Sequence, residues 1–176
     1  MNRIITLLLV MICALSLISC KKTNQIEEDY PSLEGKDTII HYVDGEDVVE
    51  KLSKKDNAII MFGFKNCPWC QSAISYVDEI AKEKGYVEVY YLDIKDMRDN
   101  EESEDRDIYL SIYNTIKEKI GNPDKIYAPT VIVLKDGEIT GYNEGTVVSH
   151  ERVDGTLPPM TDEQKEELRQ IYRNIF

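Results

Sequence analysis

The sequence predicts a single α/β domain built on one mixed central sheet that is flanked by helices. Short β-branched or apolar runs alternate with segments whose apolar residues recur at helical spacing, in the order β-α-β-α-β-α-β-β-α. A length of 176 residues leaves room for one domain of ordinary size. The content of 42% hydrophobic and 31% charged residues is typical of a soluble globular protein.

The first half of this pattern predicts three strands and two helices. A β-branched run at residues 38–43 predicts the first strand, and a short amphipathic helix follows it. The unbroken apolar run 58–64 is typical of a strand buried on both faces. A helix then begins near Pro68, because a proline is tolerated in the first turn, and ends at Gly85. Residues 86–92 predict the next strand.

The second half begins with a densely charged stretch, residues 93–107, which we interpret as a solvated loop. Isoleucines at helical spacing predict a helix over 108–120. Residues 130–134 predict a strand that enters a hairpin through the turn at 135–138. We expect the strands joined through helices to run parallel and the hairpin to add an antiparallel edge.

An irregular stretch rich in glycine and proline, residues 143–159, precedes the last helix. Thr161 and Gln164 have the spacing of a capping box that opens this helix. His150 lies in the irregular stretch, where we expect it to be solvated, and His41 is expected at a strand edge.

The first twenty residues predict a targeting segment. A short positive start is followed by apolar sequence at 4–18, which is shorter than the roughly 20 residues a membrane-spanning helix needs. The run closes on Leu17-Ile18-Ser19-Cys20, which resembles the lipobox of bacterial lipoproteins. The resemblance implies a signal peptide at 1–19 and a lipid on Cys20. An uncleaved anchor, or a plain signal peptide with a chance cysteine, is the alternative.

This interpretation gives a three-part chain: signal peptide 1–19, lipidated N-terminus and tether 20–36, and domain 37–176. The lipid would hold the domain on the outer face of a bacterial cell membrane without spanning it. The net charge of −12 argues against a nucleic-acid partner, because there is no basic surplus to neutralise phosphates.

The four cysteines divide into two pairs. Cys13 and Cys20 lie in the targeting segment, whereas Cys67 and Cys70 lie in the predicted domain. Two cysteines separated by two residues at a helix start can close a small disulfide ring, and the helix N-terminus stabilises a thiolate on the first. We therefore predict that Cys67 attacks a disulfide and that Cys70 resolves the mixed disulfide. Lys65 would add positive potential.

The residues around this pair carry a second resemblance. The run Phe62-Gly63-Phe64-Lys65-Asn66-Cys67-Pro68-Trp69-Cys70 after a buried strand, and Ala128-Pro129-Thr130 before another strand, resemble the thioredoxin-like superfamily over residues 37–176. The resemblance implies a thioredoxin fold in which Pro129 is cis and faces the dithiol, while Ala128 presents backbone to the substrate. Trp69 is expected to contact substrate, and Pro68 to shape the active-site loop.

Within that superfamily, the lipoprotein start and the charged stretch 93–107 are similar to small thioredoxin-like lipoproteins and bacteriocin-transport accessory proteins. One departure concerns the proton chemistry. Thioredoxin has a buried aspartate six residues before its first cysteine, and this chain has Met61 there. The dipeptide between the cysteines is Pro-Trp where thioredoxin has Gly-Pro. The direction of electron transfer therefore stays open.

Two functions remain at this point. The first is an extracytoplasmic thiol-disulfide oxidoreductase that acts on thiols and disulfides of exported proteins, as a monomer, with a membrane redox partner. The second is a non-catalytic accessory protein that binds an exporter or an exported peptide. We expect neither a cofactor nor a metal, because a structural zinc needs four ligands and there is no second cysteine pair in the domain. The acidic stretch also lacks the ligand spacing of an EF-hand.

Overall fold

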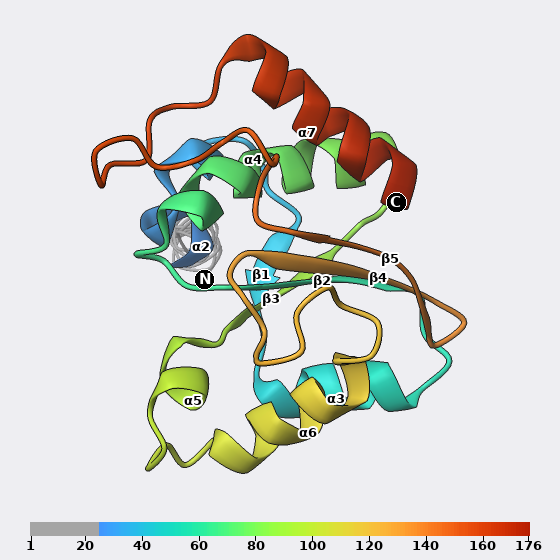
Figure 1. The fold of residues 1–176 in the computed structure, drawn as a ribbon. Helices are drawn as coiled ribbons and strands as arrows, with labels where there is room; N and C mark the ends of the chain where they lie inside the picture. The colour runs from blue at the N-terminus through green and yellow to red at the C-terminus, as the bar shows by residue number, and fades with distance from the viewer. Residues whose placement is uncertain (1–24) are drawn as a thin grey trace, which may run out of the picture.

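The computed structural model describes residues 25–176, and the predicted signal peptide and Cys20 lie outside this part of the chain. The labels are those of Figure 1. The helices are α2 (Gln25–Asp29), η1 (Pro31–Leu33, a 3-10 helix), α3 (Gly45–Ser53), α4 (Pro68–Glu83), α5 (Lys95–Asp99), α6 (Arg106–Ile116) and α7 (Asp162–Ile175). The strands are β1 (Ile40–Tyr42), β2 (Ala58–Gly63), β3 (Val89–Asp93), β4 (Thr130–Lys135) and β5 (Glu138–Glu144). Within residues 25–176 no helix is long and apolar enough to cross a membrane.

The five strands form one sheet in the order β1-β3-β2-β4-β5. β3 runs parallel to both β1 and β2, whereas β4 runs antiparallel to β2 and β5 antiparallel to β4. This confirms the predicted α/β class, the mixed sheet and the order of its strands and helices. The central strand β2 is buried along its whole length, as its unbroken apolar run predicted.

Helices cover both faces of the sheet (Figure 1). Alternate residues of each strand point to opposite faces, so the core divides into two clusters. Met61, Tyr91 and Val131 face α2, α4 and α7, whereas Ile60 and Phe62 face α3, α5 and α6. The active-site loop follows β2 and therefore lies at the end of the most deeply buried strand.

The expectation that helix-joined strands run parallel is wrong for one connection. β3 and β4 are joined through α6, yet β4 runs antiparallel to β2, which itself runs parallel to β3. The reason is the irregular stretch 117–129 after α6, which is long enough to bring the chain back to the sheet from the opposite end. This reversal delivers Ala128 and Pro129 to the same end of the sheet as the active-site loop.

The predicted boundary between tether and domain is also wrong. Residues 25–36 form α2 and η1 and pack onto the domain, where Ile26, Tyr30 and Leu33 are fully buried. The segment is predicted as a tether because most of its residues are polar. Its three large side chains nevertheless recur at helical spacing, and their burial stabilises the fold by removing apolar surface from water. The folded domain therefore includes residues 25–36.

Candidate active site

Cys67 is the residue that caps the N-terminus of α4. Pro68 occupies the first helical position, where its missing N–H costs no hydrogen bond. The backbone N–H of Cys70 donates to Cys67 Sγ over 3.2 Å. The sulfur thus takes the place of the side-chain oxygen that usually caps a helix, at the positive end of the helix dipole.

This position favours the thiolate form of Cys67. A hydrogen bond from the Cys70 thiol, followed by backbone N–H groups of Cys70 and Trp69 and the charge of Arg98, lowers the pKa of Cys67 below its usual range. Burial acts in the opposite direction but is outweighed. Since the thiolate is the nucleophile in disulfide exchange, the site activates this sulfur for attack.

Cys70 has the opposite character, one turn further into the helix. It is fully buried, and burial, together with the hydrogen bond and charge of Cys67, raises the pKa of its thiol. Both cysteines are free thiols. The pair therefore combines a nucleophile with a protonated resolving thiol, which is the division of roles predicted from the CxxC spacing.

A cluster of three tyrosines, here called the tyrosine cluster, closes the site behind Cys70. Tyr91 lies between Tyr30 and Tyr42, with ring centroids 5.5 and 5.1 Å away, and its hydroxyl is hydrogen-bonded to that of Tyr30. Tyr30 and Tyr91 are fully buried and close enough to Cys70 to interact with it electrostatically.

Tyr91 also explains why β2 ends in a glycine. A methyl group on Gly63 would lie 2.4 Å from Tyr91 Oη and 3.2 Å from Cys70 Sγ. Tyr91 is the strand neighbour of Met61, the position where thioredoxin has its buried aspartate. At the corresponding place in this chain, neutral hydroxyl groups adjoin the resolving thiol.

The segment before β4 lies opposite the dithiol. The peptide bond between Ala128 and Pro129 is cis. The thiol of Cys67 donates to the carbonyl oxygen of Ala128 over 3.3 Å. The structure thus brings together the two sequence motifs, which are 61 residues apart along the chain.

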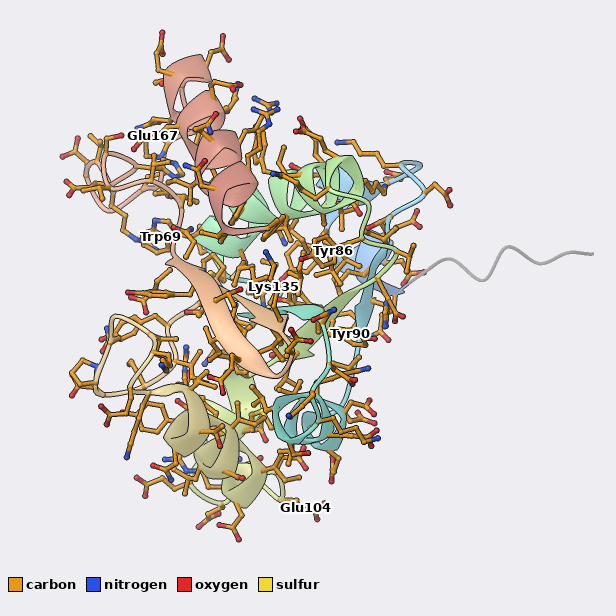
Figure 2. All side chains as sticks on the ribbon, turned by 90° about the vertical axis from the view of Figure 1, so that its right-hand side faces the viewer. Trp69, Tyr86, Tyr90, Glu104, Lys135 and Glu167 are labelled. Atoms are coloured by element: carbon orange, nitrogen blue, oxygen red, sulfur yellow. The ribbon has the colours of Figure 1, made fainter. Side chains whose placement is uncertain are left out.

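An open cleft of about 330 Å³ lies in front of Cys67 and is called the cationic cleft below. It is lined by Phe64, Asn66, Cys67, Pro68, Trp69, Arg98, Lys125, Tyr127, Ala128 and Arg152. The lining contains three cationic side chains and no carboxylate, although the whole chain has a net charge of −12. Trp69 is half-buried at the edge of this cleft, beside the segment that follows β5 (Figure 2).

The irregular segment 145–160 forms one wall of the cleft. Trp69 Nε1 donates to the carbonyl oxygen of His150 over 3.4 Å, and the guanidinium of Arg152 lies 4.7 Å from the centre of the Trp69 ring.

The expectation that His150 is solvated is wrong. It is only 3% exposed, because its two ring nitrogens bond to Thr146 Oγ1 at 2.9 Å and to the carbonyl oxygen of Pro158 at 2.7 Å.

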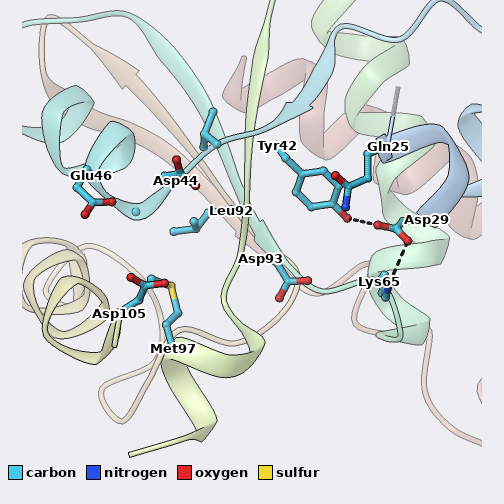
Figure 3. A pocket seen from close by; sticks show the side chains of 12 residues that line it. Gln25, Asp29, Tyr42, Asp44, Glu46, Lys65, Leu92, Asp93, Met97 and Asp105 are labelled. Carbon is cyan, nitrogen blue, oxygen red and sulfur yellow. Dashed lines mark hydrogen bonds and ion pairs between the residues drawn. The ribbon is translucent and has the colours of Figure 1, made fainter. Parts of the chain in front are cut away.

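A second cleft, here called the acidic cleft, is lined by residues of α2, the start of α3 and the end of β3 (Figure 3). Its volume is about 450 Å³, and its lining includes Asp29, Asp44, Glu46, Asp93 and Asp105. Burial raises the pKa of Asp93 above its usual range.

Lys65 lines the acidic cleft and not the cationic cleft. Its ammonium group pairs with Asp29 over 3.3 Å, and Asp29 also accepts a hydrogen bond from Tyr42 (Figure 3). Gln71 of α4 fixes the same region by donating to the carbonyl oxygens of Asp29 and Lys65, at 2.9 and 2.6 Å. Lys65 is thus tied to the N-terminal segment and fastens the active-site loop to it.

The three cationic residues of the cationic cleft were not predicted from the sequence. Arg98 lies in the charged stretch 93–107, which is not merely a solvated loop, because it contains α5 with Met97 buried. Arg98 pairs with Asp99 at 2.7 Å and donates to the carbonyl oxygen of Ile126. Lys125 and Arg152 lie in irregular segments, and no local pattern in the sequence distinguishes them from other surface cations.

His41 stands apart from the dithiol, as expected of a histidine on an edge strand. His41 lies on the edge strand β1, beside Tyr90 and 3.8 Å from Glu88. Across residues 25–176 no three histidine, cysteine, aspartate or glutamate side chains are grouped so as to hold a metal ion.

Comparisons with known proteins give limited matches. No protein-family model matches the sequence, and no curated protein matches it. Among solved structures, thioredoxin O1 from Arabidopsis thaliana in the oxidized state is 20% identical with a TM-score of 0.42, over 76% of this chain and 97% of that one. A thioredoxin-like protein from Clostridium perfringens is 17% identical with a TM-score of 0.41, over 90% and 91% of the two chains.

The arrangement of this chain is itself that of a thioredoxin-like fold. It has a mixed five-stranded sheet with helices on both faces, a CxxC pair at the start of the helix after the central strand, and a cis-proline opposite it.

Proposed function

We propose that this protein is a thiol-disulfide oxidoreductase that acts on exported proteins while anchored to the outer face of a bacterial membrane. The observation that carries the proposal is the environment of Cys67. Its sulfur receives a backbone N–H at 3.2 Å at the start of α4, faces the Ala128 carbonyl oxygen at 3.3 Å and lines an open cleft.

The exchange proceeds in two steps. The Cys67 thiolate attacks one sulfur of a partner disulfide, so that a mixed disulfide forms and the other partner sulfur leaves as a thiolate. Cys70 then gives up its proton, which the departing thiolate takes up, and its sulfur attacks Cys67 Sγ. The second partner sulfur is released, and two electrons have passed from the dithiol to the partner. The reverse sequence oxidises a partner dithiol.

The surroundings support both steps. The Cys70 thiol, followed by backbone N–H groups and Arg98, stabilises the thiolate that starts the reaction, while burial keeps Cys70 protonated until the mixed disulfide forms. We expect the backbone of Ala128, beside the cis-proline, to hold an extended peptide next to Cys67 once the Cys67 thiol no longer donates to it, since peptide recognition often uses main-chain hydrogen bonds.

The direct test is reduction of insulin by dithiothreitol in the presence of the full chain in detergent. Turbidity should appear sooner with the wild type than with Cys67→Ser. Equal rates would contradict the enzymatic function and favour the accessory role. A Cys70→Ser variant in cells should accumulate mixed disulfides through Cys67, and their absence would count against the proposal in the same way.

The location is a separate part of the proposal and rests on the lipobox-like sequence that ends at Cys20. Cleavage before Cys20 would remove Cys13, and a lipid on Cys20 would block its thiol, so Cys67 and Cys70 would carry the two free thiols of the mature chain. Radiolabelled palmitate should be incorporated into the wild type and not into Cys20→Ala. Equal labelling of the two chains would refute the anchor without affecting the redox assignment.

A further inference from the structure

The cationic cleft has a charge opposite to that of the molecule as a whole. Arg98, Lys125 and Arg152 come from three separate segments and meet around Cys67, Trp69 and Tyr127. None of the ten lining residues is acidic, although 33 of the 176 residues of the chain are aspartate or glutamate. The acidic cleft has the reverse character, with five carboxylates in its lining, although the loop 64–66 and α5 contribute residues to both clefts.

The three cations differ in what they are free to bind. Arg98 already has partners within the protein, because its side chain pairs with Asp99 and donates to the Ile126 carbonyl oxygen. Within the described part of the chain, Lys125 and Arg152 pair with no carboxylate. Lys125 Nζ lies 5.1 Å from the centre of the Tyr127 ring, and Arg152 uses one nitrogen on the Gly155 carbonyl oxygen at 2.6 Å.

Arg152 is held in place before any ligand arrives. Its guanidinium stacks on Trp69, and Trp69 is in turn bonded to the His150 carbonyl oxygen. His150 fixes the segment through its buried bonds to Thr146 and Pro158. A guanidinium oriented in advance binds a carboxylate through paired N–H donors at a smaller entropic cost than a mobile one.

We propose that the cationic cleft selects cysteines that are flanked by acidic residues in the partner protein. This inference rests on the proposed function and names its substrate class. When a partner disulfide reaches Cys67, a carboxylate beside the partner cysteine pairs with Arg152 or Lys125. A basic flank is disfavoured by the same two charges. Such pairs are partly exposed, so they affect selection among partners more than overall affinity.

The test uses two peptide disulfides with the same sequence, each a dimer of a single-cysteine peptide. One carries glutamate on both sides of the cysteine, and the other carries glutamine. In a full-length Cys70→Ser background, attack by Cys67 forms a mixed disulfide and releases one peptide thiol, which mass spectrometry follows. We expect the glutamate peptide to react roughly five- to tenfold faster, with the ratio falling as salt is added.

The ratio should fall toward one when Lys125→Gln and Arg152→Gln are combined, whereas Arg152→Lys should retain part of it. Lys135→Gln, which removes one positive charge at the exposed β4–β5 turn, is the matched control and should leave the ratio unchanged. Equal rates with the two peptides in the Cys70→Ser background, or a ratio that survives the double substitution, would overturn the inference. Failure of both peptides to form any mixed disulfide would overturn the proposed function itself.

Discussion

The surroundings of the two cysteines differ in solvent access and in charge, although Cys67 and Cys70 are only three positions apart in the chain. In front of Cys67 lies the open cationic cleft, with Arg152 and Lys125 available to a ligand. Behind Cys70 lies the tyrosine cluster, in which Tyr30 and Tyr91 are fully buried. Cys67, which faces the open side, has a lowered pKa, and Cys70, which faces the closed side, has a raised one, so one short motif supplies both a nucleophile and a protonated thiol.

The largest expected effect is a loss of stability when the N-terminal segment that forms part of the closed side is removed. A chain that begins at residue 37 loses Ile26, Tyr30 and Leu33, all fully buried. Full burial of such side chains contributes about 1.5 to 3 kcal/mol each, so the loss is about 5 to 9 kcal/mol, comparable to the whole stability of a typical domain. We expect this chain to be unfolded by circular dichroism and thermal melting. A chain that begins at residue 25 is the control. A cooperative melt for the shorter chain at the temperature of the control would show that the segment is a tether after all.

Gly63→Ala should have the next largest effect, because it forces a methyl group into the space shared by Tyr91 Oη and Cys70 Sγ. Overpacking of this kind costs up to about 3 kcal/mol. Urea denaturation should show the loss, and Tyr91→Phe in the same chain should restore part of it by removing the nearest atom. If Gly63→Ala were as stable as wild type, the close approach of these groups would be disproved.

Tyr91→Phe alone should cost about 1 to 2 kcal/mol, because it leaves the buried hydroxyl of Tyr30 without its partner. Tyr30→Phe should cost a similar amount, and the double substitution should cost less than the sum of the two. A double-mutant cycle by urea denaturation measures this coupling. Tyr42→Phe is the comparison, since the bond of Tyr42 to Asp29 is only part-buried and water can replace it. Additive losses for Tyr30 and Tyr91 would contradict the pairing.

The smallest expected effect is a change in the pKa of Cys67 when Cys70, on the closed side, is substituted. Cys70→Ala removes the thiol hydrogen bond that contributes most to lowering the pKa of Cys67, so that pKa should rise, whereas Cys70→Ser keeps a donor and should change it less. The pH profile of iodoacetamide alkylation measures it. A lowered pKa also means that the Cys67 thiolate stabilises the fold above the pKa of the unfolded thiol, and that this contribution is lost as the pH falls through the folded pKa. Superimposable profiles for the two variants would show that the hydrogen bond has no such role.

Much of the architecture was accessible to sequence reasoning because its signals are local. The apolar run of β2, the glycine and proline around α4 and the capping box at Thr161 each predicted an element that the structure contains. The CxxC spacing placed two sulfurs at a helix start for the same reason. The polar segment 25–36 was misassigned because its buried side chains are recognisable only once their binding surface exists.

The sequence by itself determined the α/β class, the order of the elements and the position of Cys67 at the start of a helix, since these depend on residues close together in the chain. Only the tertiary structure decided the environment of the two sulfurs. Tyr30, Arg98 and Arg152 reach the dithiol from an N-terminal helix, a charged stretch and an irregular segment that carry no local signal for it. Burial and charge act through distances in space, and the chain sets those distances only when it folds.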